Sequence, residues 1–225
     1  RAAQGKSPPH PPAHFRAQIE QAFHPLPIWY PPFEGAAIDE TEFPLHALTQ
    51  RPMAMYHSWG SQNAWLRQIH TANPLYVPGP VCDAAGLKDA DWVWIISRHG
   101  KVLAPVKRME GVNAQTVWTW NAIGKRAGAW RLSKNAPEAQ KGFLLNHLIH
   151  ELLPPRADGS KRGNYDPITG QAAWFDLRVR LEKADPDEAR QRPHPHDEIK
   201  HLHDEPPPRE VRYGQEWTGP TRGYR

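Results

Sequence analysis

The segment FDLRVRLEK near the end of the chain alternates strictly between apolar and polar side chains from Phe175 to Glu182. A period of two is the pattern of a strand that buries one face and exposes the other. The two faces of such a strand would carry Phe175, Leu177, Val179 and Leu181 on one side and Asp176, Arg178, Arg180 and Glu182 on the other. The pattern therefore predicts a sheet or barrel whose last strand lies here.

Other short segments also have the composition of strands. FPLHALT (residues 43–49) predicts a strand that is closed by Pro52, and AQTVWTW (residues 114–120) predicts another. The stretch DAAGLKDADWVWIISRHGKVLAPVKRM predicts a helical turn, a polar corner at Asp91 and two strands with Gly100 in the turn between them. Several short strands with few helices and long polar loops predict a mainly β fold, a small β-barrel with peripheral helices.

The clearest predicted helix is KGFLLNHLIHELLPP (residues 141–155), which Pro154 and Pro155 would end. Its apolar positions would form one stripe: Phe143, Leu144, Leu148, Ile149 and Leu152. SQNAWLRQIH predicts a second helix with Ser61 as N-cap, whose inner face would carry Trp65, Leu66 and Ile69. A shorter helical stretch is expected around FRAQIEQAF, near the N-terminus.

Composition divides the chain into three parts. Residues 1–42 are an irregular proline-rich lead-in, residues 43–183 are the barrel domain, and residues 184–225 are a charged tail rich in histidine and proline. Together these segments suggest extended N- and C-terminal arms around one core. Histidines among the carboxylates of the tail could hold a divalent metal, although such tracts are more often solvated extensions. Because the chain begins at Arg1, we expect a fragment or a processed piece.

Several classes of function are disfavoured. The net charge of +4 comes from scattered lysines and arginines, and no nucleic-acid-binding motif accompanies it, so we expect no nucleic acid partner. The single cysteine, Cys82, excludes an internal disulfide framework and has the character of a small core residue. No apolar run approaches the length that crosses a bilayer. No paired carboxylates and no Ser-His-Asp or Cys-His set stand out, so we expect neither a catalytic residue nor a metal ligand in this chain.

The segment TQRPMAMYHSWGSQNAWLRQIH, from Thr49 to His70, gathers polar groups where a strand leads into a helix. Hydroxyls and Gly60 near a helix N-terminus favour an anion, and Arg51 adds a guanidinium suited to phosphate oxygens. His57 and neighbouring amides could read the edge of a heterocycle, and Trp59 offers a stacking face. The alternative is a capped helix with a solvated polar loop. Spacing alone leaves both open, because no formal phosphate-loop motif is present.

Four elements in order resemble a known family. They are FPLHALTQRPMAMYHSWGSQNAWLRQIH, DAAGLKDADWVWIISRHGKV, LLNHL and DPITGQAAWFDLRVRLEK. Over about residues 43–183 the chain resembles the C-terminal dinucleotide-binding domain of the molybdopterin oxidoreductases, the dimethyl sulfoxide reductase superfamily. The resemblance implies a double-psi β-barrel. It also implies a cofactor, bis(molybdopterin guanine dinucleotide) carrying molybdenum or tungsten, which the barrel would cover.

The resemblance also implies which residues meet that cofactor. Those after the first strand would contact it directly, and those of the following loop would line pterin or pyrophosphate. Two later polar residues would face the cofactor. In chain order the positions are Thr49, Gln50, Arg51, Tyr56, His57, Ser58, Asn146 and Gln171. DAD (residues 89–91) and VPGPVCD depart from the usual family pattern, and both departures concern turn geometry in the outer turns of the barrel.

Within the superfamily, YHSWGSQNAWLRQI looks most like the branch that acts on sulfur and arsenic oxyanions. Sulfite dehydrogenases are nearest, and polysulfide, thiosulfate and tetrathionate reductases are close to them. This implies a catalytic subunit whose upstream part carries an iron–sulfur cluster and the metal ligand, with this portion inactive alone. It also implies three partners: the upstream part of the same subunit, an iron–sulfur subunit for electron transfer and, indirectly, a membrane anchor subunit. Quinone would be the electron acceptor. Location would be cytoplasmic or periplasmic, with the cytoplasmic side favoured. The alternative is a non-enzymatic module that binds a partner protein through the barrel and tail.

Overall fold

The computed structural model describes part of the chain: residues 16–17, 19–20, 26–27, 29, 31–35, 37–57, 59–60, 63–70, 72–121, 123, 142–150, 152–159, 162–166, 169–173 and 175–187. The predicted tail beyond residue 187 and the predicted site residue Ser58 lie outside these residues. Of the short helix expected near the N-terminus, residues 16–17 and 19–20 are described, and they are helical.

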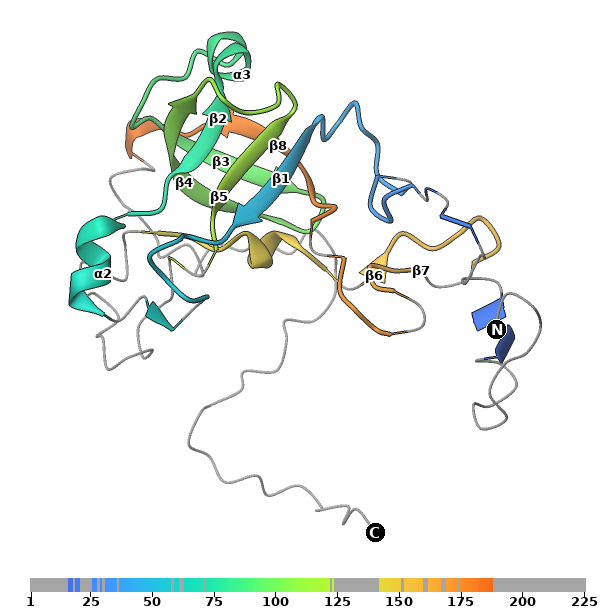
Figure 1. Ribbon diagram of the computed structural model, residues 1–225. Coiled ribbons are helices and arrows are strands. Elements are labelled where there is room, and N and C mark those ends of the chain that lie inside the picture. The colour runs from blue at the N-terminus through green and yellow to red at the C-terminus, as the bar shows by residue number, and fades with distance from the viewer. Residues whose placement is uncertain are drawn as a thin grey trace, which may run out of the picture.

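Six strands close into a barrel in the order β1-β5-β2-β4-β3-β8 (Figure 1). β1 runs parallel to β5 and β2 runs parallel to β4, whereas the other neighbouring strands are antiparallel. This architecture confirms the predicted mainly β, double-psi barrel. The strands are β1 (Leu45–Gln50), β2 (Leu75–Pro78), β3 (Trp92–Ser97), β4 (Gly100–Met109), β5 (Thr116–Trp120) and β8 (Arg178–Lys183).

Apolar side chains from all six strands fill the barrel. Leu75, Val93, Val117 and Val179 are fully enclosed, in keeping with the alternation of each strand. Cys82, from helix α3 (Gly79–Ala84), joins them, and burial raises the pKa of its thiol, as suits an inert core residue. Helix α3 covers one end of the barrel (Figure 1).

The predicted helix over residues 141–155 is wrong. The chain makes one 3-10 turn, η5 (Leu145–Leu148), and is extended on both sides of it, at Leu144 and Ile149. The Ser97 hydroxyl donates to the Leu148 carbonyl (2.8 Å), so a barrel strand holds the backbone group that a continuing helix would have used. The chain then enters a small hairpin of β6 (Leu152–Leu153) and β7 (Arg162–Gly163).

The second predicted helix is present, but it is shorter than predicted and it exposes part of the face that was expected to be buried. Helix α2 spans Ala64–Ile69, and its N-cap is Asn63, whose side-chain oxygen accepts from the Trp65 amide (3.0 Å). The predicted inner face is incorrect at two positions, because Trp65 and Ile69 are exposed. The reason is that α2 stands beside the barrel and does not lie on it (Figure 1). No helix among the described residues is both long and apolar enough to traverse a bilayer.

The described end of the lead-in packs against the barrel. Ile38 and Phe43 form a second apolar cluster with Trp94 on the outer face of β3. Arg178 of β8, predicted on a solvated face, is instead buried beneath this segment, and its Nε donates to the Phe43 carbonyl (3.0 Å). Its Nη1 lies 2.6 Å from His46 Nε2. This segment therefore covers the face of β8 at Arg178 that the alternating pattern predicted to be exposed to solvent.

Candidate functional site

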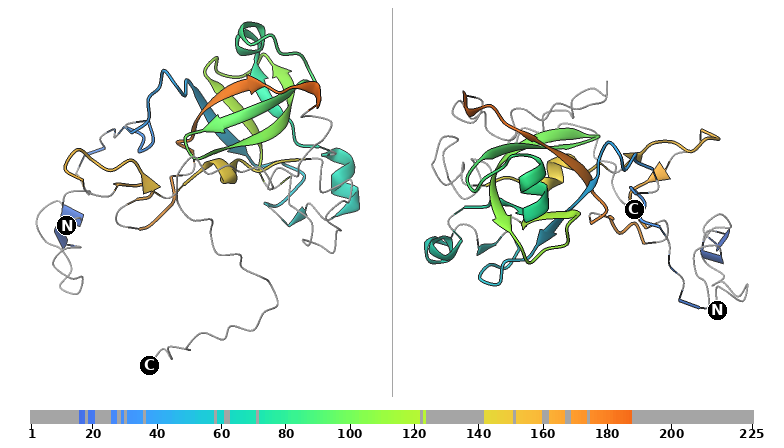
Figure 2. Two further views of the ribbon diagram at one scale, coloured as in Figure 1. Left: turned by 180° about the vertical axis from the view of Figure 1, so that it is seen from behind. Right: turned by 90° about the horizontal axis from the view of Figure 1, so that it is seen from above.

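The end of the barrel opposite α3 is where several chain segments meet, and we call it the η5 end. β1 and β5 finish there side by side, with Gln50 paired to Trp120. The β3–β4 turn at Arg98 and His99 lies there too, since Ser97 bonds to η5. Figure 2, seen from behind, shows η5 beneath the barrel and α3 above it. Loops that gather at one end of a rigid barrel are suited to surround a ligand.

The residues singled out by resemblance lie in segments that reach this end. Thr49 and Gln50 are the last residues of β1, and Arg51 follows them. The loop leaving β1 contains Tyr56 and His57, and His57 has a left-handed backbone (φ 47°). The other two predicted residues are Asn146, in η5, and Gln171, in the loop before β8.

The side chains of most of these residues face outward. Gln50, Arg51, Tyr56, Asn146 and Gln171 are exposed, so they present polar groups to whatever covers this end. Asn146 is exposed in η5, and the helix that was predicted to contain it does not form.

Buried polar atoms without partners mark the same end. Thr49 Oγ1, Arg98 Nη1 and Asn121 Oδ1 are enclosed and make no hydrogen bond to any described residue. Asn121 directly follows β5, and its amide donates to the Gln50 carbonyl (2.8 Å). Buried polar atoms are almost always paired in proteins, so three such atoms at one end of a barrel favour contact with a polar group from outside the described residues. A hydroxyl, an amide oxygen and a guanidinium suit a group that combines anionic and heterocyclic parts.

Asn73 holds this end together, a role that sequence patterns did not reveal. Its side chain is fully buried just before β2, and its Nδ2 donates to the carbonyls of Trp120 (2.8 Å) and Ile123 (2.9 Å). Its Oδ1 accepts from Thr119 Oγ1 (2.7 Å) and from the Trp120 amide (3.0 Å). Asn73 therefore fixes the chain as it leaves β5. The sequence feature that could have drawn attention to Asn73 is its position directly before Pro74.

Glu34 and Arg98 form a second unanticipated feature. The Glu34 side chain is completely buried, its Oε1 accepts weakly from the Arg178 amide (3.3 Å), and its Oε2 has no partner in the described part of the chain. Burial raises the pKa of this carboxyl to about 7, with the Arg178 hydrogen bond opposing that shift and Asp176 adding to it. Arg98 is the nearby cation, and burial lowers its pKa. A poorly solvated carboxyl therefore lies close enough to the Arg98 guanidinium at the η5 end for their charges to interact.

No group of three or more histidine, cysteine, aspartate or glutamate side chains in the described ranges could hold a metal. The arrangement therefore has binding groups of several kinds, and the described residues contain no assembled catalytic set. It can hold, orient and desolvate a polar ligand.

Asn146→Leu tests whether the exposed amide of η5 meets a ligand. Because Asn146 is exposed, its replacement should leave the melting temperature of the purified chain within a few degrees of the original value. A role toward pterin predicts a lower pterin content in the full-length protein, measured by fluorescence after acid oxidation. Unchanged pterin content together with unchanged stability would remove Asn146 from the site.

Comparison with known proteins gives a consistent family. Residues 45–162, just over half of the chain, match the family model described as "Molydopterin dinucleotide binding domain". A sulfite dehydrogenase chain of Allochromatium vinosum is 58% identical over 185 residues, covering 82% of this chain and 19% of that protein. Trimethylamine-N-oxide reductase of Haemophilus influenzae is 30% identical over 139 residues, covering 60% of this chain and 16% of that protein.

A solved structure agrees at the level of the fold. Acetylene hydratase from Pelobacter acetylenicus superposes with a TM-score of 0.51 at 16% identity, covering 73% of this chain and 22% of that one. The chain spans less than a fifth of the length of the curated relatives named above. The match to the family model over more than half of the chain, together with the barrel, shows that this chain belongs to the molybdopterin-dinucleotide-binding domain family.

Proposed function

We propose that this chain is the cofactor-binding C-terminal portion of a molybdenum oxidoreductase catalytic subunit that acts on a sulfur oxyanion such as sulfite. The observation that carries the proposal is the 58% identity to the sulfite dehydrogenase of Allochromatium vinosum over 82% of the chain. The matched stretch of 185 residues is longer than the barrel domain itself.

The cofactor we propose is bis(molybdopterin guanine dinucleotide), and the groups of the η5 end fit it. Thr49 and Asn121 would bond its polar edges, and the two guanidinium groups, Arg51 and Arg98, would face its phosphates. Gln50, Tyr56, His57, Ser58, Asn146 and Gln171 are proposed to line the same cofactor. When bound, the molybdenum cofactor supplies the oxygen-atom and two-electron chemistry.

The contribution of this chain to the reaction is to bind and enclose. The rigid barrel holds Thr49 at a fixed position, because β1 pairs along its length with β5. Closing this end against the remainder of the subunit would exclude water from the cofactor and strengthen each charged contact to it.

In the complete system, sulfite takes an oxygen atom from water and becomes sulfate, releasing two protons and two electrons. We propose that the electrons pass through an iron–sulfur cluster in the upstream part of the same subunit to a separate iron–sulfur subunit, with quinone as the final acceptor. A membrane anchor subunit would place the complex at a membrane, on the cytoplasmic side in preference to the periplasmic one.

The experiment is to purify the full-length protein that contains this chain. Molybdenum by mass spectrometry, pterin by fluorescence after acid oxidation and guanine nucleotide by chromatography are each expected. Sulfite-dependent reduction of an artificial electron acceptor is expected as well. Absence of molybdenum, pterin and nucleotide would contradict the proposal and favour a non-enzymatic interaction module.

Arg51→Ala addresses the proposed phosphate contact. Loss of one charge-assisted hydrogen bond in a dry site costs about 1.5–3 kcal/mol of cofactor binding. The full-length variant should therefore contain less molybdenum and pterin, while the melting temperature of the chain stays close to the original. Arg108→Ala is the matched control, because Arg108 pairs with Asp83 and Glu110 at the α3 end. Equal cofactor content in both variants would rule out the contact.

A further inference from the structure

Large exposed apolar side chains gather on the segment between β1 and β2. We call the described residues from 52 to 69 the α2 unit. Its side chains Met53, Trp59, Trp65 and Ile69 are 103%, 64%, 77% and 65% exposed. Trp65 and Ile69 lie four positions apart in helix α2, so they share one face of it. Single exposed apolar side chains are ordinary on a protein, whereas a concentration of them marks a surface that another molecule covers.

The α2 unit has a small core of its own, which turns these side chains outward. Met55 is buried, and Gly60 packs tightly between it and Leu66. A Cβ on Gly60 would lie 3.0 Å from Leu66 Cδ1 and 3.1 Å from Met55 Cβ, which is closer than most such contacts. The Trp59 amide donates to the Tyr56 carbonyl (2.9 Å) in the turn before Gly60. The unit is therefore folded before it meets a partner, as preorganised binding surfaces are.

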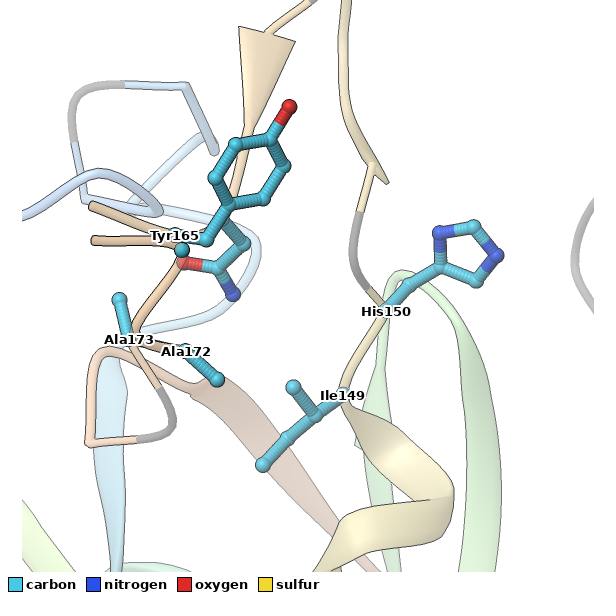
Figure 3. Close-up of a pocket in the computed structure, with 7 residues that line it drawn as sticks. Ile149, His150, Tyr165, Ala172 and Ala173 are labelled. Carbon is cyan, nitrogen blue, oxygen red and sulfur yellow. The ribbon is translucent and has the colours of Figure 1, made fainter. Parts of the chain in front are cut away.

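A second apolar region lies between η5 and the loop that precedes β8. It is a pocket of about 400 Å³ whose lining includes Ile149, Tyr165, Ala172 and Ala173, and we call it the Ile149 pocket. Figure 3 shows Ile149 pointing toward Ala172, with Tyr165 on the same side as the alanines. Tyr165 is 44% exposed, and Leu152 of the neighbouring strand β6 is exposed too.

The two apolar regions flank the polar groups of the η5 end. Figure 1 shows α2 on one side of η5 and the β6–β7 hairpin on the other, and both views in Figure 2 agree. Thr49, Gln50 and Arg51, where β1 ends, and Asn146 of η5 lie between them. An apolar rim that is tightly covered keeps water away from the polar groups that it surrounds.

The chemistry of the α2 unit narrows the choice of occupant. Permanent interfaces resemble a domain core cut in two, whereas interfaces that form and dissociate are about as apolar as ordinary surface. Two tryptophans, a methionine and an isoleucine have the first composition. A second copy of the chain fits poorly, because the segment Thr49–His70 contains Arg51 and Arg67 and no carboxylate, so self-association would bring like charges together.

We propose that the α2 unit and the Ile149 pocket are two parts of one docking face, which the remainder of the same catalytic subunit covers permanently. The inference rests on the proposed function, in which this chain is one portion of a longer subunit, and this chain spans 19% of its sulfite dehydrogenase relative. The α2 unit sits in an apolar recess of that remainder, and an apolar side chain of the remainder fills the pocket. The interface does not use Tyr56, which is proposed to line the cofactor.

The test is hydroxyl-radical footprinting of the full-length wild-type subunit, purified without other subunits, detergent or lipid and shown to be monomeric by light scattering. Mass spectrometry gives the oxidation rates of Met53, Trp59, Trp65, Ile69 and Tyr165. A covered face is packed as densely as a protein interior, so we expect each rate to be about tenfold lower than in a peptide digest of the same protein.

Rates close to those of the digest, for either region, would overturn the proposal. Protection of the α2 unit that appears only after addition of the iron–sulfur subunit, of phospholipid vesicles or at concentrations where the protein dimerises would overturn it as well. The face would then belong to that other partner.

Trp65→Lys combined with Ile69→Lys tests the α2 unit directly. Two charges cannot be buried there without partners, so the unit should undock and the oxidation rates of Met53 and Trp59 should rise about fivefold or more. Ala114→Lys is the matched control, because it adds the same charge at an exposed position in the β4–β5 turn. Unchanged rates in the double variant would contradict docking through α2. If that variant does not fold, the wild-type footprint still decides.

The proposed function can fail separately from this inference. An uncovered α2 unit in protein that contains molybdenum and pterin would overturn the docking face and leave the proposed function standing. A covered α2 unit in protein that contains neither would remove the proposed function and leave the interface.

Discussion

Replacing Asn73 with leucine should lower the free energy of unfolding of the chain by roughly 3–5 kcal/mol. Leucine has a similar volume, but it would leave the buried Thr119 hydroxyl without its Asn73 acceptor and the carbonyls of Trp120 and Ile123 without their Asn73 donor. Unpaired buried groups of this kind are among the few causes of large losses from one substitution. Urea unfolding followed by tryptophan fluorescence would measure the change.

Asn113→Leu provides the matched control for Asn73. The Asn113 side chain is exposed, and its oxygen accepts only a local bond, from the Gln115 amide (2.9 Å). It should cost about 1 kcal/mol or less. Comparable losses in the two variants would show that Asn73 is not the organising group of the η5 end.

Glu34→Gln should remove a pH-dependent loss of stability. The pKa of the Glu34 carboxyl is about 7 in the folded chain against an ordinary value of 4.5, so between these pH values the folded state keeps a proton that the unfolded state has released. The contribution of Glu34 to stability is therefore greatest at or below pH 4.5 and falls as the pH rises from 4.5 through 7, by about 3 kcal/mol in total. Glutamine never ionises, so the variant should lack this decline. Chemical unfolding of both proteins from about pH 5 to 8 gives the difference.

Other titrating groups contribute equally to the pH dependence of stability in Glu34→Gln and in the original chain, so the comparison between the two removes their contribution. His46 is the main one, because burial and the Arg178 charge lower its pKa, so its contribution is lost as the pH falls. That slope has the opposite sign and is common to both proteins. Glu42→Gln is the control: its carboxylate is exposed and pairs with Arg180. If the free energy of unfolding of Glu34→Gln falls with pH as steeply as that of the original chain, Glu34 is not a buried carboxylic acid with a raised pKa.

Strands with a clear local pattern could be predicted from the sequence. β8, β3, β4 and β5 were found because their alternation or their β-branched and aromatic content is visible in a short window. β2 was missed because Pro74 and Pro78 frame a four-residue strand, and prolines argue against a strand inside a sheet. The error over residues 141–155 has a related cause, since an apolar run fits a helix as well as an extended chain until its packing partners are known.

The site was less accessible to prediction from the residues alone. The segment after β1 drew attention through its polar content, but its role came from family resemblance. Asn73 and Glu34 share a property that one sequence does not display, namely burial of a polar group by segments distant in the chain. Burial of Glu34, for example, depends on β8, whose Arg178 is 144 positions away.

The strand order of the barrel bears on how the protein is made. β8 is the last of the six barrel strands in chain order, yet it pairs with both β1 and β3 and so closes the barrel. Until it emerges from the ribosome, those two strands retain open edges, which are prone to pair with other chains. The loop after β1 and the unpaired atoms of the η5 end thus reach their final arrangement only when synthesis has passed Lys183. Long-range closure of this kind folds slowly. A nascent chain would therefore depend on protection of β1 over the whole of that interval, and a ligand of the η5 end could enter only afterwards.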